Sequence, residues 1–194
     1  MVQRDTVSLT EQQRLVRDSI RDVCGDFDAA YWRERDAAGE YPQEFVDALA
    51  ENGWFGALIP EAYGGAGMGT EEAVVMMEEI AASGGGFGAA QAVHGAIYNS
   101  VPLVKYGSED LKAELLPKVA SGEESIQAFG LTEPNAGSDS TSIETTAEKS
   151  EARSSSERSG AAAEKDGDEY VIDGGKLWTS NGSVADTVIV FAKT

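Results

Sequence analysis

The chain has 194 residues, 41% of them hydrophobic, and its 34 acidic against 15 basic residues give a formal net charge of −19. A chain of this length and apolar content can bury a core, which excludes a disordered acidic tail, and its charge excludes recognition of nucleic acid through a basic face. One cysteine and one histidine exclude a disulfide framework and a Cys/His zinc site.

The N-terminal region shows helical patterns. Residues 10–13, Thr-Glu-Gln-Gln, form a capping box, and Val16, Ile20, Val23 and Phe27 follow on one helical face. The spacing predicts a first helix that buries this apolar face.

Two further helices are framed by their end signals. Pro42 at a first helical position and Gly53 just past the end predict a short second helix. Thr70 is expected to cap a third helix, with two glutamates in its first turn, and the glycines at 84–86 stop it.

The next stretch predicts two more helices. A fourth is expected over about 88–104, bent or ended by Pro102. A fifth is expected over 109–120, with Ser108 as its cap and Gly122 just past its end.

The texture of the chain changes near Ser125. Short runs at 126–131, 170–172 and 187–192 are rich in β-branched and aromatic residues and predict strands. Helices come first and strands second, so we expect an α+β fold and not alternating β-α-β units.

This order predicts two domains, a helical one over 1–124 and a partial β domain over 125–194. Residues 150–164 contain no apolar side chain larger than alanine. Such a segment cannot contribute to a core, so we expect it to be a flexible insertion between two strands.

The first candidate motif is Gly-Leu-Thr-Glu-Pro-Asn-Ala-Gly-Ser-Asp-Ser-Thr-Ser at 130–142. A strand delivers the hydroxyl of Thr132 and breaks at Pro134, and the turn at 136–139 exposes backbone N–H groups. Such a turn suits a phosphate or the polar edge of a heterocycle. Taken alone, an ordinary strand-to-loop junction explains the same residues.

The second candidate motif is Lys-Leu-Trp-Thr-Ser-Asn-Gly at 176–182. A tryptophan beside two hydroxyl residues and before an Asn-Gly turn can lay its indole ring against an aromatic ligand. A core tryptophan on a strand that enters a turn is the alternative.

Other features are interpreted as structural. Residues 84–89 match the spacing G-x-G-x-x-A, but a helix precedes them where a dinucleotide site needs a strand, so we interpret them as a helix breaker. We expect His94 and Cys24 to be packed helix residues, and no G-x-S-x-G elbow suggests a serine hydrolase.

Together, the two motifs resemble those of the acyl-CoA dehydrogenase family, FAD-dependent enzymes of fatty-acid and amino-acid breakdown. Residues 130–142 match the family's first signature at every defined position, and 176–182 are similar to its K-x-W-I-T-N-G segment. The resemblance covers about residues 9–194. It implies an N-terminal helical domain followed by the first part of an antiparallel β-barrel-like domain.

The resemblance also implies a set of flavin-facing residues. Thr132 would bond the pyrimidine edge of the flavin, and Ser138 would reach the FAD pyrophosphate or the acyl-CoA substrate. Trp178 would pack against the ring system, with Thr179 and Ser180 near N5. The implied cofactor-binding residues are Phe129, Gly130, Leu131, Thr132, Gly137, Ser138, Trp178, Thr179 and Ser180.

The chain departs from the family in two respects. The second motif reads Trp-Thr-Ser where the family has Trp-Ile-Thr. Family members are also longer, and their catalytic glutamate comes from a C-terminal helical domain. Glu133 belongs to the signature and is not a substitute, so we assign no catalytic base.

The expected function is therefore the first part of an acyl-CoA dehydrogenase, inactive as this chain alone. The family reaction removes a proton α to a thioester and passes a hydride from the β carbon to flavin N5. Two alternatives stay open: a non-catalytic binding or assembly partner, and one half of a split dehydrogenase or oxidase. The expected partners are acyl-CoA, FAD and either further copies or a complementing chain.

The sequence also predicts where the protein works. No run approaches the roughly 18–20 apolar residues of a membrane span, and residues 1–6 contain no apolar signal region, so we expect a cytoplasmic protein. Acids spread through every segment are typical of proteins kept in solution in concentrated salt, so we hypothesise a halophilic source.

Overall fold

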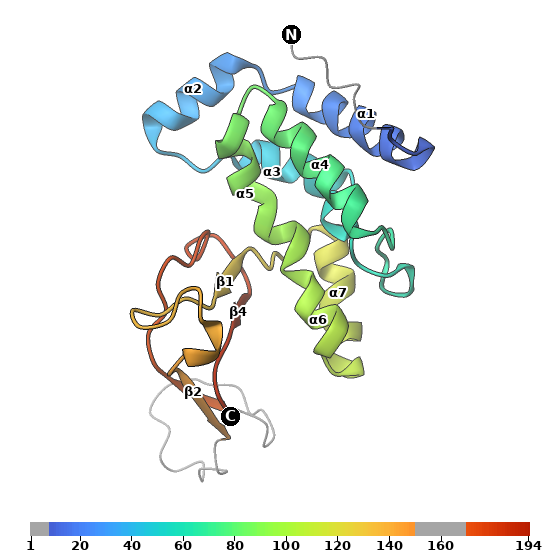
Figure 1. The fold of residues 1–194 in the computed structure, drawn as a ribbon. Coiled ribbons are helices and arrows are strands. Elements are labelled where there is room, and N and C mark those ends of the chain that lie inside the picture. The colour runs from blue at the N-terminus through green and yellow to red at the C-terminus, as the bar shows by residue number, and fades with distance from the viewer. Residues whose placement is uncertain (1–7, 150–169) are drawn as a thin grey trace. The chain divides into compact units, whose positions relative to one another are not determined.

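The computed structural model describes residues 8–149 and 170–194, so the predicted insertion over 150–164 lies outside the described residues. They divide into two units (Figure 1). Unit 1 comprises 8–128 and Asn181–Val188, and unit 2 comprises the described parts of Phe129–Ser180 together with Ile189–Thr194. The chain thus leaves unit 1 just before the first motif and returns to it within the second. The domain boundary at 124/125 stays a prediction.

Unit 1 is built from seven helices and two 3-10 turns in the part of the chain that the structure describes. The helices are α1 (Glu11–Gly25), α2 (Ala29–Ala38), α3 (Gln43–Glu51), α4 (Thr70–Ala82), α5 (Gly86–Tyr98), α6 (Ser100–Tyr106) and α7 (Glu109–Ser121). The 3-10 turns cover Trp54–Gly56 and Glu61–Tyr63.

The predicted start of the first helix and the predicted ends of the last helix are confirmed, whereas α1 ends at Gly25, before the Phe27 that was predicted on its face. The Thr10 hydroxyl accepts from the Gln13 amide and the Gln13 side chain accepts from the Thr10 amide, both at 3.1 Å, which completes the capping box of α1. The Ser108 hydroxyl caps α7, and Gly122 ends it with φ +78°. These signals act within one turn of the chain, so sequence alone suffices to place them.

Three predicted boundaries are wrong in detail. Pro42 is the N-cap of α3 and not its first residue. Gly69, not Thr70, caps α4, because the Glu72 carboxylate accepts from the Gly69 amide and replaces a hydroxyl cap. The predicted fourth helix is two helices, α5 and α6, that divide at Asn99; Pro102 lies in the first turn of α6, where no backbone N–H is needed.

Helix α2 was not predicted. Its N-cap is Asp28, whose carboxylate accepts from the amides of Ala30 and Tyr31. No residue of α2 is buried, so it lacks the apolar periodicity that marks an amphipathic helix. Trp32 nevertheless anchors it, since its ring meets Phe45 of α3 edge-on with centroids 5.0 Å apart.

The core of unit 1 lies among α1, α3, α4 and α5, with α1 packed on α4 and α4 on α5 (Figure 1). Its completely covered side chains include Ile20, Phe45, Leu49, Met76 and Val93. Burying each such side chain contributes roughly 1.5–3 kcal/mol. Of these, Ile20 lies on the one apolar face that the sequence analysis predicts, whereas the others come from helices that were predicted from their end signals.

The strands are β1 (Ala128–Gly130), β2 (Thr146–Lys149), β3 (Tyr170–Asp173) and β4 (Val188–Val190). The three predicted strand runs are found, β1 and β4 shorter than predicted and β3 one residue longer, and a fourth strand, β2, was not predicted. β2 and β3 pair antiparallel with Thr146 opposite Asp173, and β1 pairs with β4. Within the described residues the strands form two two-stranded sheets, so the mixed fold is confirmed and the barrel-like closure stays a prediction.

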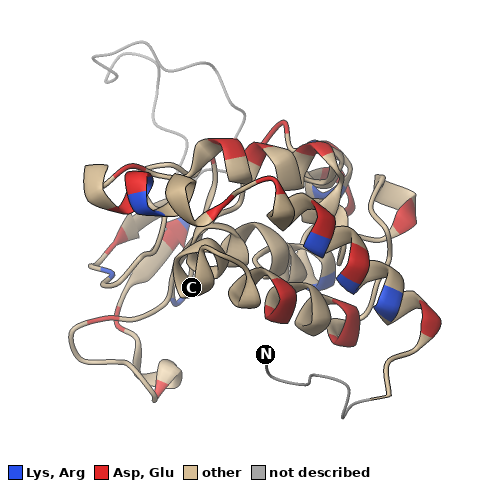
Figure 2. Cartoon of the chain, turned by 90° about the horizontal axis from the view of Figure 1, so that it is seen from above, with Lys and Arg blue, Asp and Glu red and all other residues tan. Residues whose placement is uncertain are grey.

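Acidic residues are spread along the helices and outnumber basic ones (Figure 2). Among residues 8–149 and 170–194, no helix is both long enough and apolar enough to cross a membrane. The cytoplasmic location stays an expectation from the sequence.

Candidate functional site

The first motif begins where β1 ends and forms a tight turn within unit 2. The Glu133 amide donates to the Ala136 carbonyl at 2.9 Å, and the Ala136 amide donates back at 3.2 Å. Asp139 then caps the 3-10 turn at Ser140–Ser142 by accepting from Thr141 and Ser142. These hydrogen bonds, that of Ser142 first, lower the Asp139 pKa, so the carboxylate organises the turn.

Burial changes along this motif from the strand to the turn. Gly130 is buried, and Leu131 and Thr132 are half-buried. Gly137 and Ser138 are exposed, at the turn where we expected backbone N–H groups to face a ligand. The predicted site residues therefore run from the interior of unit 2 to its surface within nine positions.

The second motif contains a strained, exposed tryptophan. Trp178 has a backbone φ of +60° and a side chain that is 85% exposed. A bulky L-residue seldom adopts this left-handed conformation, which costs roughly 1–2 kcal/mol. Thr179 and Ser180, the predicted N5 contacts, follow as half-buried residues. Strain of this kind is concentrated at functional sites.

Unit 2 brings the two motifs side by side. The Leu177 amide donates to the Thr132 carbonyl at 2.8 Å, and the Lys176 ammonium donates to the Leu131 carbonyl at 3.2 Å. Lys176 also forms an ion pair with Glu133, with Nζ 2.6 Å from Oε1. Residues that the sequence places 43 positions apart thus become direct neighbours.

The Glu133 carboxylate is buried and hydrogen-bonded to three donors of the chain. The residue is 5% exposed, and its carboxylate accepts from the amides of Glu144 at 2.5 Å and Thr145 at 3.0 Å as well as from Lys176. Burial acts to raise the Glu133 pKa, but these donors, with Lys176 the strongest, outweigh it and lower the pKa to about 2. Glu133 is therefore a buried, hydrogen-bonded carboxylate with a structural role.

A polar cluster in unit 1 holds the two points at which the chain crosses between units. The Asn181 side chain donates to Gln127 Oε1 at 3.2 Å. The Tyr41 hydroxyl donates to the Ala92 carbonyl at 2.8 Å and lies 3.0 Å from the same Gln127 oxygen. Burial raises the pKa of Tyr41 to about 12, so the hydroxyl stays a donor. Sequence reasoning missed this cluster, whose hydrogen bonds join positions up to 90 residues apart.

Helix α5 provides the platform for this cluster. The Asn99 side chain donates to the Ile126 carbonyl at 2.9 Å. A Cβ on Gly95 would lie 2.3 Å from the Gln127 carbonyl oxygen, so only glycine lets α5 approach the segment that enters β1 this closely. The positions of Ile126 and Gln127, just before the first motif, are therefore set by α5.

His94 and Cys24 are packed helix residues, as expected. His94 lies on α5 against the ring of Tyr98, and its Nδ1 is 2.7 Å from the Gln91 carbonyl oxygen. Cys24 is buried, and burial raises the pKa of its thiol, which makes it unreactive. No group of three His, Cys, Asp or Glu residues that could hold a metal occurs within the described ranges.

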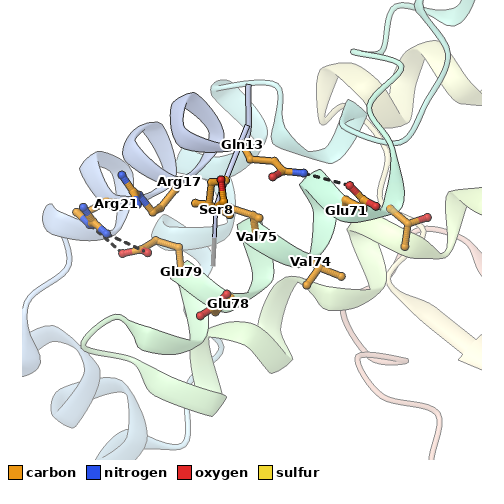
Figure 3. A pocket seen from close by; sticks show the side chains of 11 residues that line it. Ser8, Gln13, Arg17, Arg21, Glu71, Val74, Val75, Glu78 and Glu79 are labelled. Carbon is orange, nitrogen blue, oxygen red and sulfur yellow. Dashed lines mark hydrogen bonds and ion pairs between the residues drawn. The ribbon is translucent and has the colours of Figure 1, made fainter. Parts of the chain in front are cut away.

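A groove of about 690 Å³ lies between α1 and α4, away from both motifs in sequence (Figure 3). The Arg21 guanidinium spans it and donates to both Glu79 oxygens at 2.9 and 3.2 Å. Near the other end, the Gln13 side chain donates to Glu71 at 3.2 Å. Both contacts hold α1 against α4, so we interpret the groove walls as part of the helix packing.

Known proteins were compared with the chain as a whole. It matches the family model for the acyl-CoA dehydrogenase N-terminal domain over residues 10–123 and the model for the acyl-CoA dehydrogenase middle domain over 128–194. The two matches abut in the order that the motifs predict and take in nearly all of the chain.

Individual relatives give the same result. The chain is 36% identical to mitochondrial isovaleryl-CoA dehydrogenase from Pongo abelii, a match that covers 96% of this chain and 40% of that protein. It is 34% identical to a 3-(aryl)acrylate reductase from Clostridium sporogenes, over 95% and 44%. Butyryl-CoA dehydrogenase from Megasphaera elsdenii superposes with a TM-score of 0.76 at 31% identity, over 96% and 45%. The chain thus spans less than half the length of these relatives.

Proposed function

Because the chain belongs to the acyl-CoA dehydrogenase family, with matches to its N-terminal and middle domains, we propose that it is the first part of an FAD-dependent acyl-CoA dehydrogenase. FAD, when bound, supplies the acceptor for the hydride that leaves the β carbon of the acyl thioester. The residues of this chain bind and orient that cofactor. Solved relatives include a Bacillus anthracis acyl-CoA dehydrogenase complexed with FAD, at 27% identity and a TM-score of 0.72.

One observation carries this proposal: Trp178 is held exposed in a left-handed conformation beside the first motif. Its indole face is open to receive a flat aromatic ring. The Leu177 amide fixes the Trp178 segment to Thr132, so the hydroxyl of Thr132 and the indole belong to one local structure. We propose that the flavin contacts are Phe129, Gly130, Leu131, Thr132, Gly137, Ser138, Trp178, Thr179 and Ser180.

We assign no catalytic base to the described residues. The reaction needs a carboxylate that takes up a proton near neutral pH. Glu133, the acid of the signature, has a pKa of about 2 and is closed in by an ion pair and two amides. We therefore propose that this chain alone binds cofactor and does not turn over acyl-CoA.

The test is a titration of the purified chain with FAD, followed by flavin fluorescence and absorbance. We expect Trp178→Ala to weaken binding about three- to tenfold, since an aromatic pair contributes roughly 0.5–1.5 kcal/mol. Phe87→Ala is the matched control, because Phe87 is an equally exposed aromatic residue, at 80%, that lies on α5 outside both motifs. Equal affinities of the two variants, or no binding by the wild type, would contradict the proposal.

One observation favours the second candidate, a chain that works with a complementing polypeptide as half of a split dehydrogenase or oxidase. β3 presents Tyr170, Val171 and Ile172 more than half exposed, on both faces of a two-stranded sheet. Isolated two-stranded sheets are marginal in water, so further strands would stabilise them. A colourless, stable monomer that gains no partner on co-expression with its genomic neighbour would favour a non-catalytic protein instead.

A further inference from the structure

The ion pair between Lys176 and Glu133 is buried in unit 2. The Lys176 side chain is 11% exposed and that of Glu133 is 3% exposed. Removing two charges from water is costly, so such a pair persists only when each charge is well satisfied. Both are: Lys176 reaches the Leu131 carbonyl as well, and Glu133 accepts two backbone amides besides the ammonium.

The backbone of the first motif is shaped to admit the lysine. A Cβ on Gly130 would lie 3.3 Å from Cγ of Lys176 and 3.7 Å from its Cβ. The lysine stem therefore lies against the strand where a side chain is missing. This is an observation independent of the ion pair, and it gives the buried Gly130 a role in seating Lys176.

Trp178, the residue with the strained left-handed backbone, lies close to this ion pair in the sequence. Trp178 lies two positions beyond Lys176, and its own side chain is almost fully exposed, so it makes little packing of its own to hold a left-handed backbone. A strained conformation survives only when neighbouring structure imposes it. The Lys176 ammonium, bonded to Glu133 and Leu131, and the Leu177 amide, bonded to Thr132, fix the chain just before Trp178.

We propose that Lys176 is a positioning residue: through its ion pair with Glu133 it holds the Trp178 segment against the first motif in the exposed, left-handed conformation. The contacts above support the claim that Lys176 holds the Trp178 segment. The expected effect on FAD binding rests on the proposed function. Lys176 acts through Trp178 and touches no cofactor. The conformation of the second motif therefore depends on the first, because Lys176 of the second motif is bound to Glu133 of the first.

The experiment compares Lys176→Met, which keeps the stem and removes the charge, with Lys176→Arg, which keeps the charge. Lys118→Met is the matched control, since Lys118 pairs with Glu124 at 2.8 Å in unit 1, outside both motifs. The full chain is measured twice, by amide hydrogen exchange without FAD and by FAD titration. Lys176→Gln, which keeps a hydrogen-bond donor, replaces Lys176→Met if the latter does not fold.

We expect Lys176→Met to speed exchange of the Leu177 amide at least tenfold, with α1 and α5 unchanged, and to weaken FAD binding several-fold. Lys176→Arg should recover most of both effects, and Lys118→Met should match the wild type. Unchanged exchange at Leu177, or equal loosening throughout unit 1, overturns the inference. Absence of FAD binding by the wild type refutes the proposed function instead, because the exchange result is obtained without FAD.

Discussion

Helix α5 closely approaches the chain before β1, and this approach can be tested with two glycine-to-alanine substitutions on that helix. We expect one to lower the free energy of unfolding and the other to raise it. Gly95→Ala would place a methyl group 2.3 Å from the Gln127 carbonyl oxygen and 2.9 Å from its carbon. Both are backbone atoms, so no side chain can swing aside, and the helix or the segment must move. Gly88 lies on the same helix, and a Cβ there meets nothing within 4 Å.

The size of each effect follows from these surroundings. Overpacking costs about 1–3 kcal/mol, and a backbone clash of this depth lies at the upper end. Alanine returns about 1 kcal/mol of helix propensity at either position. The free energy of unfolding should therefore fall by about 2 kcal/mol in Gly95→Ala and rise by up to ~1 kcal/mol in Gly88→Ala.

Thermal unfolding followed by circular dichroism measures both variants against the wild type. For a chain of this size 1 kcal/mol shifts Tm by about 2–4 °C, so Gly95→Ala should melt roughly 4–8 °C lower and Gly88→Ala a few degrees higher. A Tm of Gly95→Ala at or above that of the wild type would refute the close approach between α5 and Gln127. A lower Tm in both variants would instead show that the loss of stability does not come from the contact between Gly95 and Gln127.

Three further predictions concern strain, pH and salt. Trp178→Gly removes the left-handed strain, so its Tm should not fall although FAD binding weakens as in Trp178→Ala; a clear drop in Tm would show that the indole packs as part of the core. The folded pKa of Glu133 is lowered from 4.5 to about 2, so its contribution to stability is complete above about pH 4.5 and disappears as pH falls toward 2. The fall in Tm over that range should be shallower in Glu133→Gln than in the wild type, and parallel curves would contradict the assignment. With a net charge of −19, the Tm should rise from low to molar KCl, because salt shortens the range of repulsion from about 10 to 3 Å, and an unchanged Tm would refute the halophilic hypothesis.

The helices that the sequence predicts are those whose signals are local. The capping box at Thr10 and the cap at Ser108 each act within one turn, and both are found in place. Helix α2 escaped prediction because it buries no side chain completely, and its stability comes from Asp28 and from the contact of Trp32 with Phe45. That contact joins two separate helices, so it produces no helical spacing of apolar residues that the sequence could reveal.

The candidate site divides in the same way. Its two motifs are visible in the sequence because hydroxyl and glycine residues are clustered in each and the second also contains Trp178. The contact that joins them is not visible, since Glu133 and Lys176 are 43 residues apart, and neither is the contact of Tyr41 with Gln127 in unit 1, across 86 residues. A charge pattern in an acidic chain gives no hint of which of its 34 acids is buried.

Glu133 shows why a strongly specified acid need not be a catalyst. A general base must be able to gain a proton, and its carboxylate must reach a substrate. Glu133 instead joins the end of β1, the chain before β2 and Lys176 of the second motif, and every donor that fixes it also lowers its pKa. The same contacts that make it useful for architecture disqualify it for proton transfer. Glu133 therefore anchors the second motif through Lys176, and its carboxylate is not suited to take up a proton near neutral pH.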